Sequence, residues 1–471
     1  MIIRRLKALA AVALCCWLPA GISCQAPGRQ ESAVKNPPSP EAARPPYEEF
    51  LAGARELNRR ILNLDTHVDI PWDFATEELD PGVRQEKLQV DLVKMAEGDL
   101  DAVFFIGWAR QGPLTAEGYS RARDQVAHSF EAIHRLCEQM YPGRIELAVS
   151  PAEVERITGA GKLAAVIGLE NGYPLGTDLS MVETYYGLGV RYITLCHVGH
   201  NQICDSANPP FGEQPDDAGL DEAGKQLLSW VYGVDFYSDA SPEPLHGGLS
   251  GFGRQVVAEM NRLGIMVDVS HLAAGSVLDV VEASSAPVIA SHSCCRALCN
   301  ITRNLDDRCL RAIKESGGCI QVTAVPGFVK LPVEQLEAVS ALLDSLGATE
   351  MDFPSLFAMY NENRPAYDSL VQRSSEGFKR IEMQSVRPDV SDLVDHLDYL
   401  VEVVGIDHVG IGSDFGGGGG VRGFNSAAEA VNVTAELLRR GYTEEDIARI
   451  WGGNLLRVWR EVGQAAEVKD L

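Results

Sequence analysis

Apolar runs of strand length alternate with helix-length segments along most of the chain. Eight runs follow this pattern, and each is apolar enough to be buried on both faces, which is typical of parallel strands joined by crossover helices. Eight such units in succession predict an α/β fold of the TIM-like (β/α)8 barrel type. The runs are residues 61–67, 100–108, 163–170, 190–197, 264–271, 287–292, 318–325 and 408–414.

Side chains that can bind a metal or transfer a proton stand at the ends of six of these eight runs. Functional groups of parallel barrels gather at the C-terminal mouth, where the strands end. One histidine at a strand end is usually structural, but four of the ten histidines of this chain occupy such positions. The residues are His67 with Asp69, Glu170, His197, His271, His292 and Asp414.

Two further features refine this picture of the mouth. His67 and Asp69, in ILNLDTHVDIPWDF, are two apart on one strand, so their nitrogen and oxygen atoms face the same point and predict a metal-binding pair. Asp65 and Asp268 lie near the same mouth. We expect them to orient a ligand or to accept hydrogen bonds from the backbone.

The N-terminal residues predict export. Arg4, Arg5 and Lys7 precede an apolar stretch, residues 8–18, that is too short to span a bilayer, so residues 1–24 are expected to be a signal peptide. The segment GISC resembles a bacterial lipoprotein cleavage box, which favours lipidation of Cys24 over ordinary cleavage nearby. Residues 25–46 are Pro-rich and predict a disordered tether. The protein is thus expected to be a cell-envelope lipoprotein anchored at Cys24, or otherwise periplasmic or secreted.

Residues 47–471 are expected to form a single metallohydrolase barrel domain. Two long insertions, residues 208–251 after the fourth run and 326–406 after the seventh, follow strands at the mouth and are expected to govern specificity. The net charge of −25, from 66 acidic and 41 basic residues, argues against a nucleic-acid partner. The cysteines fit no zinc-finger spacing, and their pairing stays open.

The ordered set of motifs resembles the zinc-dependent membrane dipeptidases, also called renal dipeptidases, within the barrel metallohydrolases. The resemblance covers nearly all of residues 47–471, and the whole ordered set is more specific than any single motif. Its motifs are DTHVDIPWDF, AVIGLENG, GVRYITLCHVGHNQICDSA, MVDVSH, PVIASHSCCRALCNITRNLDD, HVGIGSDFGG and GGNLLRVW.

The resemblance implies two Zn²⁺ ions bridged by Glu170. His67 and Asp69 would complete the protein ligands of one ion, and His271 and His292 those of the other. Imidazoles and carboxylates are ligands suited to zinc, and one carboxylate has two oxygens for two cations. Many barrel hydrolases instead begin with His-x-His and bridge their metals through a modified lysine.

The remaining residues of the motifs receive roles by the same resemblance. Asp414 would accept the proton of the attacking water and pass it to the leaving amine. His197 would stabilise the tetrahedral oxyanion and contact the substrate. Arg303 would bind the free C-terminal carboxylate of a dipeptide through two parallel hydrogen bonds. The family also implies a possible homodimer.

Two alternatives stay open at this point. A related amidohydrolase acting on N-acyl amino acids or lactam-type small amides would use the same centre, and Arg303 suits those substrates as well. A non-catalytic binding lipoprotein built on a barrel is the other alternative, although no proposed metal ligand is missing from the sequence.

Overall fold

The computed structural model describes residues 45–208, 243–349, 351, 353–384 and 386–466. These residues fall into two compact units, one containing residues 47–208, 243–332 and 386–466 and the other containing residues 333–384. The predicted signal peptide, Cys24 and nearly all of the predicted tether lie outside the described residues, as do residues 209–242 of the first insertion. The prediction of a single domain over residues 47–471 stays a prediction.

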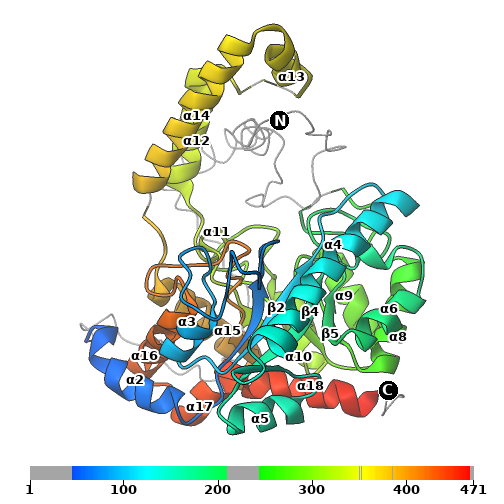
Figure 1. The fold of residues 1–471 in the computed structure, drawn as a ribbon, viewed down its shortest axis with the longest axis vertical. Helices are drawn as coiled ribbons and strands as arrows, with labels where there is room; N and C mark the ends of the chain where they lie inside the picture. The colour runs from blue at the N-terminus through cyan, green and yellow to red at the C-terminus, as the bar shows by residue number, and fades with distance from the viewer. Residues whose placement is uncertain (1–44, 209–242, 350, 352, 385, 467–471) are drawn as a thin grey trace, which may run out of the picture. The chain divides into compact units, whose positions relative to one another are not determined.

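The larger unit is a nearly closed barrel of parallel strands, which confirms the predicted fold class (Figure 1). Neighbouring strands follow the order β1-β2-β4-β5-β6-β7-β8-β9, and all of these pairs are parallel. The eight strands are β1 (Leu64–Asp69), β2 (Ala102–Trp108), β4 (Leu163–Glu170), β5 (Val190–Thr194), β6 (Met266–Asp268), β7 (Val288–Ala290), β8 (Cys319–Val322) and β9 (Val409–Ile411).

The ring closes between the first and the last strand. The backbone N–H of Asp69 donates to the carbonyl of Phe415 at 2.7 Å, and that of Asp414 donates to the carbonyl of His67 at 3.0 Å. Each of the eight predicted runs corresponds to one strand. The sequence pattern missed β3 (Ile145–Leu147), which pairs with β4 outside the ring and is too short for a periodic signal.

Helices surround the barrel, as expected for crossover connections (Figure 1). In the larger unit these are α2 (Leu51–Asn58), α3 (Leu92–Glu97), α4 (Ala116–Arg135), α5 (Pro151–Gly159), α6 (Ser180–Gly187), α8 (Gly251–Leu263), α9 (Ala274–Ala283), α10 (Asp307–Glu315), α11 (Pro326–Val329), α15 (Val390–Val404), α16 (Ala430–Arg440), α17 (Glu444–Ala448) and α18 (Asn454–Ala465). Short 3-10 or π turns are η1 (Tyr47–Phe50), η2 (Leu136–Met140), η3 (Tyr173–Leu175), η4 (Ile406–His408), η5 (Ala427–Glu429) and η6 (Arg449–Gly453).

Local sequence signals explain where several helices begin and end. Thr115 accepts a hydrogen bond from the backbone N–H of Gly118 and so caps α4, which satisfies one of the free N–H groups of its first turn. Asp389 and Asp392 form a reciprocal capping box at the start of α15. Gly264 ends α8 with φ of 79°, a left-handed conformation that a residue without Cβ adopts at little cost.

The second insertion contributes most of the smaller unit. It consists of α12 (Val333–Leu346), α13 (Phe353–Glu362) and α14 (Arg364–Gln384), which share an apolar core that includes Leu343, Leu356 and Tyr367. Of the helices in the part of the chain that the structure describes, none is long and apolar enough to cross a membrane.

Candidate metal centre

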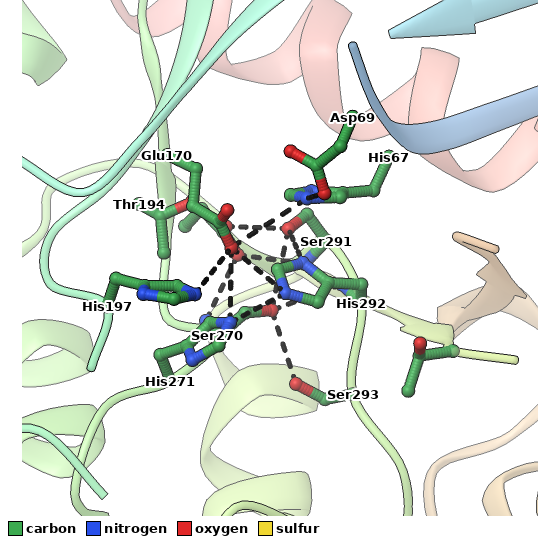
Figure 2. A network of polar contacts seen from close by, with 12 residues as sticks. His67, Asp69, Glu170, Thr194, His197, Ser270, His271, Ser291, His292 and Ser293 are labelled. Carbon is green, nitrogen blue, oxygen red and sulfur yellow. Dashed lines mark hydrogen bonds and ion pairs between the residues drawn. The ribbon is translucent and has the colours of Figure 1, made fainter. Parts of the chain in front are cut away.

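Glu170 occupies the middle of a cluster of histidines at the barrel mouth. Figure 2 shows its carboxylate among the imidazoles of His67, His197, His271 and His292. Its Oε1 lies 3.1 Å from Nε2 of His271 and 3.3 Å from Nε2 of His292. The Nε2 atoms of His67 and His197 lie 3.7 and 3.9 Å from the same oxygen. The structure thus brings together residues from five different strand ends.

Two more carboxylates complete the cluster on the side of His67. Oδ2 of Asp69 lies 3.7 Å from Nε2 of His67, and Asp414 offers a ligand atom within 4.8 Å of both residues. Gly417 leaves the room for this pair, because a Cβ at that position would lie 2.1 Å from Asp69 Oδ2 and 2.2 Å from Asp414 Oδ1. All five predicted metal ligands, together with Asp414 and His197, therefore converge on one place.

Most of these side chains stand just beyond the strands. Only His67, Asp69 and Glu170 lie within a strand, because the ladders end two or three residues before His197, His271, His292 and Asp414. Two buried carboxylates give one reason for the early ends. Asp65 accepts hydrogen bonds from the backbone N–H groups of His67 and Ser413, and Asp268 accepts them from Ser270 and Ser291. Both aspartates support the backbone at the mouth.

The outer nitrogen of His67 is fixed by Tyr192 on β5. The Tyr192 hydroxyl donates to the carbonyl of Thr66 at 3.1 Å, so its oxygen accepts from Nδ1–H of His67 at 2.8 Å. The Nε2 lone pair then faces the cluster, and this buried atom has no hydrogen-bond partner among the described residues. A hydrogen bond to the outer nitrogen of this kind is typical of metal-binding histidines.

His292 is held in the same way by a serine and an aspartate. The Ser291 hydroxyl donates to Asp268 Oδ2 at 2.6 Å, which leaves its oxygen to accept from Nδ1–H of His292 at 2.8 Å. Nε2 of His292 therefore presents a lone pair, and it lies only 2.9 Å from Nε2 of His271. Two imidazole nitrogens this close to each other and to a carboxylate form a donor set that suits a cation.

The electrostatics of the cluster support the same conclusion. Burial raises the pKa of Glu170 well above its usual range, and burial is also the main cause that raises the pKa of Asp414 to about 7. Burial lowers the pKa of His197 to about 3 and keeps those of His271 and His292 low, so these imidazoles stay neutral. Metal cations bind neutral imidazoles and stabilise the ionised form of buried carboxylates.

His67 differs from the other histidines. Burial lowers its pKa, but Glu170, Asp69 and Asp414 outweigh this effect and raise the pKa to about 10. The three carboxylates therefore favour a positive charge at Nε2 of His67. A metal cation at the same nitrogen supplies that charge in place of a proton.

Arg303 lies behind His292 and is only 2% exposed. Its Nη1 donates to Ser293 Oγ at 3.1 Å and its Nη2 to the carbonyl of His292 at 2.8 Å. Its Nε is buried without a partner, and within the described ranges no carboxylate lies in salt-bridge distance of the guanidinium. The charge of Arg303 is therefore buried near the centre, where Asp414 and Glu170 are its main electrostatic partners.

A cavity of about 550 Å³ opens onto the cluster. Asp69, Glu170, His197, His271 and Asp414 line its floor, so a small substrate can reach the predicted centre. Arg303 is not among the lining residues. Sequence reasoning missed Tyr192 and the two tryptophans of the walls, Trp72 and Trp108.

Comparisons with known proteins agree with this geometry. The model of the membrane dipeptidase family, peptidase family M19, matches residues 51–234 and 228–471. Dipeptidase tcpJ of Claviceps purpurea is 28% identical over 404 residues, which cover 84% of this chain and 74% of that protein. Dipeptidase 3 of Rattus norvegicus is 28% identical over 422 residues, covering 88% and 68% of the two chains.

Solved structures give the same result. The probable dipeptidase PvdM from Pseudomonas aeruginosa is 33% identical with a TM-score of 0.73, over 89% of this chain and 100% of that chain. A metallopeptidase from Rhodobacter sphaeroides, solved with a phosphinate mimic of L-Ala-D-Ala, shares the fold at 21% identity and a TM-score of 0.63, over 85% and 99%. The family match spans nearly the whole barrel, and the chain therefore belongs to the membrane dipeptidase family.

Proposed function

We propose that the protein is a dinuclear zinc dipeptidase that hydrolyses dipeptides with a free C-terminal carboxylate. The observation that carries this proposal is the position of Glu170, whose Oε1 lies within 4 Å of Nε2 of four histidines. In this proposal Glu170 would hold two Zn²⁺ ions, together with His67 and Asp69 on one side and His271 and His292 on the other. When bound, the ions would supply Lewis acidity and a water of lowered pKa.

Two other residues of the cluster have roles in the reaction: one transfers a proton and the other stabilises negative charge. Asp414 accepts the proton of the attacking water and returns it to the leaving amine, for which a carboxyl of raised pKa is suited. His197 is neutral and lies at the edge of the cluster, 3.9 Å from Glu170, where its N–H can stabilise the oxyanion of the tetrahedral state.

Arg303 recognises the substrate carboxylate in this proposal. Two of its nitrogens already donate to Ser293 and His292, and its Nε has no partner among the described residues. Because Arg303 is buried and does not line the cavity, in this proposal a local shift on substrate binding brings the remaining N–H groups to the carboxylate. Its long-range charge also attracts an anionic substrate end. A dipeptide carries that charge close to the scissile bond.

Metal analysis and a substrate panel on one sample test the proposal. Purified protein is expected to contain two zinc equivalents, to lose activity with a chelator and to regain it with Zn²⁺. The panel compares L,L and L,D dipeptides with N-acyl amino acids and a lactam. Turnover of the acyl compounds or the lactam alone would replace the dipeptidase with the related amidohydrolase, and a protein without zinc and without turnover would support the binding lipoprotein.

Export and lipid attachment belong to the same proposal. The basic and apolar N-terminus followed by GISC supports a lipoprotein anchored at Cys24, with contact to the membrane through the lipid only. Family membership supports a possible homodimer. Mass spectrometry of the mature N-terminus tests the first point, and light scattering of the purified chain tests the second.

A further inference from the structure

Trp72 is an exposed aromatic side chain at the mouth of the active-site cavity. It stands three residues after Asp69, lines the cavity and still exposes 64% of its surface. Its indole stacks on the imidazole of His128, with ring centroids 3.7 Å apart and an angle of 7° between the planes. Because His128 covers one face, the exposed surface lies mainly on the other face and the edges. Exposed aromatic surface beside a site is typical of ligand contact.

Helix α4 holds the loop that carries Trp72. His128 Nε2–H donates to the carbonyl of Trp72 at 2.7 Å, so one side chain fixes both the ring and the backbone of the tryptophan. Arg135, two turns further along α4, donates to the carbonyls of Phe74 and Ala75 at 3.2 and 2.7 Å. The indole is thus presented to the cavity in a defined position, which limits the entropy lost when a ligand packs against it.

The rest of the cavity wall is apolar or uncharged. Ile70, Pro71, Trp108, Val325 and Phe328 contribute apolar surface, and Gln125 and Ser129 of α4 contribute neutral polar groups. Within the described part of the chain, the lining residues include no lysine or arginine, and its carboxylates are the three of the metal centre. Among these described lining residues, a charged substrate side chain would lose hydration and find no oppositely charged partner outside the metal centre.

We propose that Trp72, positioned by His128, forms a side-chain subsite that selects dipeptides with an uncharged apolar side chain, aromatic ones above all. This proposal rests on the proposed dipeptidase function and specifies its substrate class. An apolar side chain gains from burial against the indole in proportion to its area, and an aromatic ring adds the stacking interaction. In this proposal His128 is a positioning residue, because it acts on the substrate only through Trp72.

Two dipeptide series test the substrate preference of the zinc-loaded enzyme. In X-Gly and Gly-X, the residue X is Ala, Leu, Phe, Glu or Lys. We expect kcat/KM to rise from Ala to Leu to Phe in at least one series, by roughly tenfold or more overall, and to fall below the Ala value for Glu and Lys. A flat profile in both series, or a maximum at Lys or Glu, would overturn the subsite.

Substitution of His128 tests its positioning role. His128→Ala is expected to raise KM for the Phe substrate about tenfold. The kcat for the Ala substrate and the zinc content should stay unchanged. His128→Phe is expected to recover part of the loss, because a phenyl ring can again stack on the indole of Trp72. The matched control is His134→Ala, since His134 is also on α4 and donates to a carbonyl, that of Leu188 at 3.1 Å, outside the cavity. Equal losses for both substrates, or the same loss in the control, would contradict the proposal.

The failure of the subsite can be distinguished from failure of the proposed function. If dipeptides are cleaved with no preference for apolar side chains, the subsite is wrong and the dipeptidase stands. If the zinc-loaded protein cleaves no dipeptide, the function is wrong, and binding of N-acetylphenylalanine and N-acetylalanine is measured by quenching of tryptophan fluorescence. Tighter binding of the aromatic compound, lost in Trp72→Ala, would still support the subsite, and equal binding would overturn it.

Discussion

Replacing Tyr192 by phenylalanine should weaken zinc binding while leaving the barrel folded. The Tyr192 hydroxyl is the acceptor for Nδ1–H of His67 at 2.8 Å, and both side chains are completely buried. Phenylalanine fits the same space, which Gly168 provides, since a Cβ on Gly168 would lie 2.6 Å from Cζ of Tyr192. The substitution therefore removes a hydrogen bond and leaves the ring in place.

The size of the effect follows from this one contact. A buried N–H left without an acceptor costs about 1–3 kcal/mol, and the loss of such outer partners typically reduces metal affinity roughly 10–100-fold. The carbonyl of Thr66 also loses the donor at 3.1 Å, but that loss is the same with and without metal. The loss of this hydrogen bond to Thr66 therefore lowers the free energy of unfolding but leaves the zinc affinity unchanged. We therefore expect the affinity for the zinc ion that His67 would hold to fall roughly 10–100-fold.

The zinc affinity is measured by titrating zinc into metal-free protein in competition with a chromophoric chelator. The melting temperature of the metal-free protein shows whether the variant is still folded. Tyr185→Phe is the matched control, because the Tyr185 hydroxyl is equally buried but has no hydrogen-bond partner among the described residues. Its removal should leave zinc affinity unchanged. An unchanged affinity in Tyr192→Phe, or an equal decrease in both variants, would refute the reasoning that Tyr192 orients His67.

Three further substitutions test other parts of the centre. Asp414→Asn should keep both zinc equivalents and reduce kcat roughly 10²–10⁴-fold, because a carboxamide cannot accept the proton; normal turnover would exclude the proton-transfer role. Gly417→Ala should reduce zinc content as measured by atomic absorption, since its Cβ would lie 2.1 Å from Asp69 Oδ2 and 2.2 Å from Asp414 Oδ1. Arg303→Ala should reduce kcat/KM strongly for dipeptides and weakly for their C-terminal amides, and equal losses would contradict carboxylate recognition.

The fold was predictable because its signals are local. Strands buried on both faces are apolar throughout, so each of the eight runs could be found without knowledge of its neighbours. The placement of Glu170 with the four histidines followed from one rule, that parallel strands end at a common mouth. The lengths of the strands were less predictable, because the carboxylates of Asp65 and Asp268 take backbone N–H groups at the mouth.

Contacts between distant segments could not be predicted. The Tyr192–His67 hydrogen bond joins β5 and β1 across the barrel interior, and the pattern of either strand carries no information about its partner. The stack of Trp72 on His128 likewise depends on how α4 packs against a loop 56 residues earlier. The burial of Arg303 behind His292 was also not predictable, since the sequence indicated only its expected role in carboxylate binding and not its neighbours.

The metal centre concentrates several features that destabilise the metal-free fold. His271 and Asp414 have φ of 69° and 61°, a left-handed conformation that costs a residue with a side chain of the order of 1 kcal/mol. Backbone hydrogen bonds hold both residues, from Ala207 N to the carbonyl of His271 at 2.8 Å and from Asp414 N to the carbonyl of His67 at 3.0 Å. These bonds fix the side chains in directions that a relaxed backbone would not give.

The same place carries buried carboxylates of raised pKa and a buried Nδ1 of His271 without a partner. Each feature destabilises the metal-free fold, and strain, desolvation and an unpaired polar atom rarely coincide without a ligand that relieves them. Cations between Glu170 and its neighbours would neutralise the carboxylates and use the imidazole lone pairs that face them. The arrangement is therefore better explained as a binding site whose stability depends on its metals than as a structural cluster of histidines.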